Sequence, residues 1–142
     1  MRYFLDSSYL IDFTGKKHKR HNQVKQILDL LFKDGSNEFV INRLVYVEVL
    51  RGIKLIEVKN YRDTLEVLQS FQTFEINKQV YDEAITFSRF CRSNGFTLKG
   101  EGCAAIDFIH FIFSKHYDLN MLSSDIDMDK LETKYSEFTG SG

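Results

Sequence analysis

The sequence is poor in the residues that mark disulfide-rich or membrane-bound proteins. Its 142 residues include two cysteines and no proline, and two cysteines cannot form a disulfide framework. Cys91 and Cys103 both lie in apolar helical patterns, where a free thiol packs as a small hydrophobic group. This pattern predicts a reducing, cytoplasmic setting.

Long apolar runs are also missing. Asp6 and Asp12 interrupt the apolar N-terminus, and no run of about 18 or more apolar residues follows. We therefore expect neither a signal peptide nor a membrane anchor.

An excess of charge of one sign is absent as well. Nineteen basic and twenty acidic residues give a net charge of −1, which argues against a strongly basic nucleic-acid-binding domain. One dense basic cluster follows the N-terminal segment, with His18 and His21 interleaved; its members are Lys16, Lys17, Lys19 and Arg20. Such a cluster either contacts phosphates or is a solvated loop, and the sequence leaves both open.

The length fits one compact domain. We expect a single domain over residues 1–136 and a flexible tail over 137–142, because Gly140, Ser141 and Gly142 give a linker-like end.

Short apolar strands alternate with amphipathic helices. The strands are expected at Arg2–Asp6, Glu38–Asn42 and Leu119–Ser123. The helices are expected after Asp6, over 24–35, 43–54, 58–71, 78–93 and 103–113, and over 128–135. Valines make the 43–54 segment suitable for a strand too. The alternation predicts a three-layer α/β/α fold with a central parallel sheet of four to five strands, and with 58–71 and 78–93 forming a helical hairpin.

Asp107 is the most informative polar residue, because within CAAIDFIHFIF only His110 is another polar side chain. An ionised carboxylate in an apolar helix needs a partner charge, hydrogen bonds or a metal ion. Pairing with a buried cation, or a position at the helix edge, would also satisfy it. His110, three residues on, shares the helix face and is favoured as a core hydrogen-bonding group over a substrate contact.

Asp6 and Asp125 each come just after an apolar strand. Parallel sheets place ligands at the carboxyl ends of their strands, so we expect both side chains at one sheet edge. Each could instead cap the following helix. Glu48 is the single acid in the apolar run LVYVEVL, and it either faces solvent or joins the site.

These segments, taken in order, resemble the PIN-domain ribonucleases and most closely the VapC toxins of toxin–antitoxin pairs. The similarity rests on LDSSYLI with Asp6, VEVLRG with Glu48, AAIDFIHF with Asp107 and MLSSDIDM with Asp125. It spans residues 2 to about 136. Ser7 and Ser8 stand where the family commonly has threonine and asparagine, and Asp127 competes with Asp125 for the fourth acidic position.

The resemblance implies a Mg²⁺- or Mn²⁺-dependent endoribonuclease whose ligands are Asp6, Glu48, Asp107 and Asp125. Carboxylates suit these hard cations, whereas zinc would require a His and Cys cluster. Ser7 would hold a substrate phosphate or a water molecule. The resemblance also implies an RNA substrate, a small antitoxin protein that covers the acidic site, and a homodimer. A PIN-like module that binds RNA or protein without cleavage is the alternative.

Overall fold

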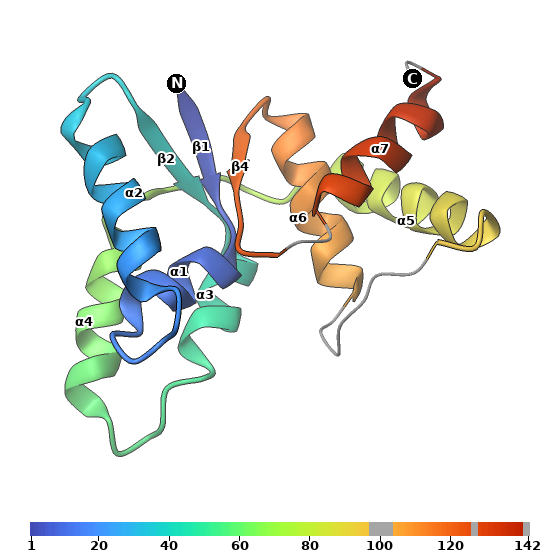
Figure 1. Cartoon of the computed structure of the whole chain (residues 1–142). Helices are drawn as coiled ribbons and strands as arrows, with labels where there is room; N and C mark the ends of the chain where they lie inside the picture. Colours follow the sequence, from blue (N-terminus) through green and yellow to red (C-terminus); the bar gives the residue numbers. More distant parts are fainter. Residues whose placement is uncertain (97–103, 126–127, 141–142) are drawn as a thin grey trace. The chain divides into compact units, whose positions relative to one another are not determined.

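The computed structural model describes residues 1–96, 104–125 and 128–140 (Figure 1). The chain forms two compact units. Unit 1 comprises Met1–Glu75 and Leu119–Ser124, and unit 2 comprises Ile76–Asp118 and Asp125–Gly142.

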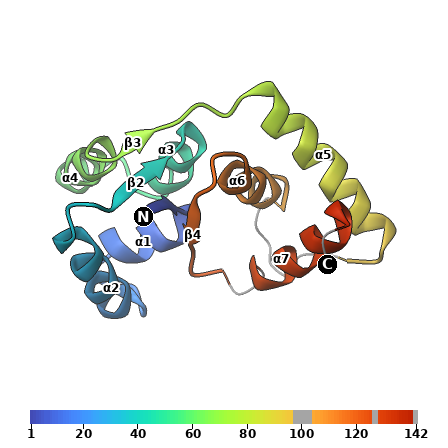
Figure 2. The same ribbon diagram turned by 90° about the horizontal axis from the view of Figure 1, so that it is seen from above.

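Unit 1 is built on a parallel sheet that has four strands among the described residues. They are β1 (Arg2–Leu5), β2 (Glu38–Ile41), β3 (Gln72–Thr73) and β4 (Asn120–Leu122), in the order β3-β2-β1-β4 (Figures 1 and 2). Phe4 is in register with Val40 on one side and Met121 on the other. The predicted parallel sheet is thus confirmed, and β1 and β4 are neighbours.

The central strands are covered on both faces. Phe4 and Leu5, and likewise Val40 and Ile41, are fully buried. Consecutive strand residues point to opposite faces of a sheet, so burial of both members of each pair requires apolar cover on both sides. This explains why these strands have continuous apolar sequences rather than alternating ones.

Four helices of unit 1 connect its strands. They are α1 (Ser7–Thr14), α2 (His21–Lys33), α3 (Arg43–Leu50) and α4 (Val58–Gln69). α1 packs against α2 and α3, and α3 against α4. The valine-rich segment is helical because Asn42 caps it, with its side-chain oxygen accepting a hydrogen bond from the Val45 N–H at 3.2 Å. α3 ends four residues before the predicted boundary.

Unit 2 contains three helices within the described residues, α5 (Lys78–Ser93), α6 (Ala104–His116) and α7 (Met128–Thr139). Phe87 of α5 is fully buried and its ring lies 5.3–5.7 Å from four other aromatic rings. They belong to Phe108, Phe111, Tyr135 and Phe138. The predicted apolar character of α6 agrees with the burial of Phe111, Ile112 and Phe113.

The predicted helical hairpin is interrupted by a strand. β3 lies between α4 and α5 and pairs with β2, and the Phe74 N–H continues this pairing by donating to the Ile41 carbonyl oxygen at 2.9 Å. The two helices fall in different units. At the C-terminus, α7 extends to Thr139, into the segment expected as a tail.

Two further expectations concern the thiols and the membrane. Cys91 is a buried free cysteine, whereas Cys103 lies outside the described residues. Among the helices that the structure describes, none has the length and apolar character needed to span a bilayer.

Candidate active site

Asp6 lies where the sequence places it, directly after β1, and is 3% exposed. It caps α1. Its Oδ1 accepts a hydrogen bond from the Ser7 N–H at 2.9 Å, and its Oδ2 accepts from the hydroxyls of Ser8 at 3.0 Å and Ser123 at 2.8 Å. Three donors on one buried carboxylate offset its loss of hydration and fix its orientation.

The partners of Asp6 come from both ends of the sequence because β1 and β4 are neighbours. The Asp6 N–H donates to the Leu122 carbonyl oxygen at 3.0 Å, which extends the strand pairing past Leu5. Ser123 and Ser124 then follow β4, and the Ser8 and Ser123 hydroxyl oxygens are 3.2 Å apart. A hydroxyl-lined site therefore forms around Asp6 at the carboxyl edge of the sheet.

Ser7 is buried and contributes its backbone N–H to this site. Ser8, which stands where the family commonly has asparagine, contributes its hydroxyl. Ser123 was not predicted as a site residue at all. Its position two residues before Asp125 was the available signal.

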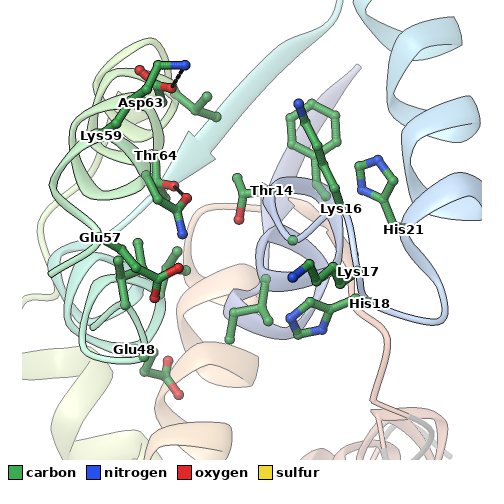
Figure 3. A pocket seen from close by; sticks show the side chains of 18 of the residues that line it. Thr14, Lys16, Lys17, His18, His21, Glu48, Glu57, Lys59, Asp63 and Thr64 are labelled. Atoms are coloured by element: carbon green, nitrogen blue, oxygen red, sulfur yellow. Dashed lines mark hydrogen bonds and ion pairs between the residues drawn. The ribbon is translucent and has the colours of Figure 1, made fainter. Parts of the chain in front are cut away.

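Glu48 lies on α3 and is partly exposed. It lines a cavity of about 1020 Å³ in unit 1. The cavity is formed by the end of α1, by the connection between α1 and α2, and by the helices α3 and α4. In Figure 3, Lys16, Lys17 and His18 lie on one side of this cavity and Glu48 and Glu57 on the other. All four members of the predicted basic cluster are exposed, and two of them, Lys16 and Lys17, line the same cavity as Glu48.

Asp107 and Asp125 belong to unit 2, whereas Asp6 and Glu48 belong to unit 1. Asp107 lies in the first turn of α6 and is partly exposed, where the helix dipole favours a negative charge. The sequence suggested a carboxylate buried in an apolar helix, whereas the Asp107 side chain is partly exposed, so its ionised form costs less than full burial would imply. Asp125 follows β4 by three residues and is also partly exposed.

The four-carboxylate cluster stays a prediction. Within neither unit do three or more described His, Cys, Asp or Glu residues form a group that could hold a metal ion. Asp127, the competitor of Asp125, lies outside the described residues. His110 is fully buried, which agrees with the predicted core role.

Asp12 and Arg20 also contact the segment after β4. The Ser124 hydroxyl donates to Asp12 Oδ2 at 2.7 Å, and Arg20 Nη1 donates to the Ser124 carbonyl oxygen at 2.9 Å. The sequence named Arg20 as a candidate for phosphate contact within the basic cluster, and it predicted no site role for Asp12.

Comparison with known proteins supports the fold. The model of the PIN domain family matches residues 3–134. No curated protein sequence shows a significant match.

Three solved structures are similar to this chain at low sequence identity. The first is VapBC2 from Rickettsia felis bound to a DNA fragment from the VapBC2 promoter. One of its chains has 15% sequence identity and a TM-score of 0.72, and the match covers 92% of this chain and 93% of that chain. Mycobacterium tuberculosis VapC20, a sarcin–ricin loop cleaving toxin, has 12% sequence identity and a TM-score of 0.69. The match covers 90% of this chain and 93% of that chain. A chain of a toxin–antitoxin complex from Klebsiella pneumoniae has 16% sequence identity and a TM-score of 0.60. The match covers 87% of this chain and 88% of that chain.

Proposed function

Because this chain belongs to the PIN-domain family, we propose that it is a Mg²⁺- or Mn²⁺-dependent endoribonuclease and the toxin of a toxin–antitoxin pair. The observation that carries the proposal is the buried Asp6 carboxylate, which lies at the carboxyl edge of a parallel sheet and is oriented by Ser7, Ser8 and Ser123. Ligand carboxylates are typically oriented by such hydrogen bonds.

The donor set fits a hard divalent cation. Asp6, Glu48, Asp107 and Asp125 would supply carboxylate oxygens, which Mg²⁺ and Mn²⁺ prefer together with water. Held by these carboxylates, a divalent ion would supply activation of a water molecule and neutralisation of charge on the leaving oxygen of a phosphodiester. Asp127 would act as a supporting acid.

The protein's own contribution is to hold the reacting groups. Ser8 and Ser123 fix the Asp6 carboxylate, which limits the positions that a bound ion can take. The cluster Lys16, Lys17, Lys19 and Arg20 would contact RNA phosphates. Two of its members, Lys16 and Lys17, lie on the side of the cavity opposite Glu48.

A small antitoxin is the proposed protein partner. Two of the similar structures are a VapBC pair and a toxin–antitoxin complex. The connection between α3 and α4 supports a protein-binding role, because Leu55 is 99% exposed and Ile56 is 87% exposed. The family also suggests a homodimer in the cytoplasm, and light scattering would measure its mass.

Substitution of the proposed ligands tests the nuclease activity. We expect Asp6→Asn and Asp107→Asn to abolish cleavage of total RNA in Mn²⁺, because each removes a charged ligand, while circular dichroism remains unchanged. Asp82→Asn is the control, since Asp82 pairs with Lys78 on the exposed face of α5. Cleavage at the wild-type rate by both ligand variants would contradict the proposal.

Calorimetry separates the nuclease from a non-catalytic PIN-like binding module. The wild-type chain should bind Mn²⁺, and Asp6→Asn should weaken that binding. Absence of binding at millimolar Mn²⁺ would favour the non-catalytic module. Mapping of the ends of cleaved RNA would then identify the substrate.

A further inference from the structure

Ser124 uses every one of its polar groups to join the end of β4 to two other segments of unit 1. Its N–H donates to Ser8 Oγ at 3.1 Å, its hydroxyl donates to Asp12 Oδ2 at 2.7 Å, and its carbonyl oxygen accepts from Arg20 Nη1 at 2.9 Å. Because Ser8 Oγ in turn donates to Asp6, a continuous chain of hydrogen bonds runs from Asp6 to Asp12.

Asp12 extends this chain to the basic connection between α1 and α2. Its Oδ1 lies 3.6 Å from His18 Nδ1, and its carbonyl oxygen lies 3.0 Å from His21 Nδ1. The Asp12 side chain is only 15% exposed. A carboxylate with so little access to water depends on protein donors, so these contacts hold both the acid and its partners in place.

The connection itself is a tight turn. The His18 N–H donates to the Gly15 carbonyl oxygen at 2.8 Å, and the His21 N–H donates to the His18 carbonyl oxygen at 3.1 Å. A Cβ atom on Gly15 would lie 2.1 Å from His18 Cδ2. Only glycine therefore allows the His18 ring to approach α1 closely enough to meet Asp12.

We propose that Asp12 is a positioning residue that holds the basic connection, residues 15–20, against Ser124 so that its lysines are presented to RNA beside Asp6. This role rests on the proposed function. Lys16, Lys17 and Lys19 are exposed and have flexible side chains, so the backbone that carries them decides which phosphates they reach. Arg20 serves as the second anchor through Ser124.

The sign of the effect on RNA affinity distinguishes positioning from simple electrostatics. Asp12→Ala removes a negative charge, and charge alone would then strengthen binding to RNA. Loss of positioning has the opposite effect. We expect Asp12→Ala to weaken the binding of a labelled single-stranded oligoribonucleotide roughly five- to tenfold, the scale of one ordinary net hydrogen bond.

Binding would be measured by fluorescence anisotropy in the Asp6→Asn background, where cleavage does not interfere. Asp12→Asn carries the same charge as Asp12→Ala but keeps an oxygen for the Ser124 hydroxyl, so it should recover part of the affinity. Ser124→Ala leaves the charge unchanged and should weaken binding in the same direction. Asp82→Ala is the charge-matched control and should not weaken it.

Hydrogen–deuterium exchange provides a readout that does not depend on RNA. In Asp12→Ala, the amides of residues 15–20 and 123–124 should exchange faster, while those of β1 keep their wild-type protection. Unchanged exchange in these segments, or wild-type RNA affinity in both Asp12→Ala and Ser124→Ala, would overturn the proposal. If the wild-type chain binds RNA without cutting it, the proposed nuclease fails and the affinities still decide the role of Asp12.

Discussion

Individual residues in this chain show how hydrogen bonding makes buried and partly buried polar groups tolerable. Asp6 and Tyr135 illustrate two solutions. The Asp6 carboxylate accepts three hydrogen bonds and is oriented for binding. The Tyr135 hydroxyl instead donates to Glu83 Oε1 at 3.0 Å, which requires it to keep its proton.

The pKa of Tyr135 gives a prediction on alkaline stability. Burial, and then the hydrogen bond to Glu83, raise this pKa from 10.0 to about 12. The folded state thus holds the phenolic proton more tightly than the unfolded state. The resulting stabilisation is complete below pH 10.0 and is lost as the pH rises to about 12.

Tyr135→Phe isolates this contribution, because its ring keeps the aromatic contacts with Phe87 and Phe111 and has no proton to lose. As the pH rises from 10 to 12, the unfolding free energy of the wild type should fall relative to that of Tyr135→Phe. Urea titrations over that range measure it. A difference that is constant with pH would contradict the assignment.

Some site residues could be predicted from the sequence and others could not. Asp6 was predictable because it directly follows an apolar strand, and ligands bind at the carboxyl ends of parallel strands. Asp12, Ser123 and Ser124 gave no such signal, since a polar residue on a helix or after a strand is ordinary. Their contacts join positions more than a hundred residues apart, and only the pairing of β1 with β4 brings them together.

At the scale of elements, the position of Glu48 depends on how α3 begins. Asn42 is fully buried, and its side chain accepts from the Val45 N–H at the first turn. The helix has only eight residues and three valines, so its intrinsic helical preference is weak. The cap therefore stabilises the element that carries Glu48.

Replacement of the cap should destabilise the protein measurably. We expect Asn42→Ala to lower the unfolding free energy by about 1–2 kcal/mol, as measured by urea denaturation with an unchanged dependence on urea concentration. Asn42→Ser keeps an oxygen at the cap and should recover much of the loss. Equal stability of Asn42→Ala and the wild type would show that α3 does not depend on this cap.

Elements with strong patterns were predicted and the weakest one was not. β1, β2 and β4 were expected within one or two residues of their observed bounds because their apolar runs are bounded by polar residues. β3 was missed because Gln72 and Thr73 are only two residues long and are not fully buried. It is an edge strand, paired only with β2 in the described sheet. So short a strand with little burial shows no recognisable pattern of apolar residues in the sequence.

For the whole molecule, charge is balanced overall but unevenly placed. The net charge is −1, yet the exposed connection between α1 and α2 carries Lys16, Lys17 and Lys19 within four residues. Binding to a polyanion would therefore depend on this local cluster rather than on the net charge. The sequence predicted the cluster, but the position of Lys16 and Lys17 in a cavity shared with Glu48 depends on the packing of α1, α3 and α4.

The salt dependence of RNA binding tests the role of this cluster. Each phosphate contact to single-stranded RNA contributes about 0.7 to the slope of log affinity against log salt concentration. If all three lysines contact phosphates, replacing them by glutamine should reduce the slope by about 2. Arg20 is left in place because it also donates a hydrogen bond to Ser124.

The matched control replaces three lysines elsewhere by glutamine, namely Lys33, Lys78 and Lys134, which changes the net charge equally. If the slopes of the two triple variants agree, the cluster is only a solvated loop; a slope reduced in the cluster variant alone identifies it as the surface that contacts RNA.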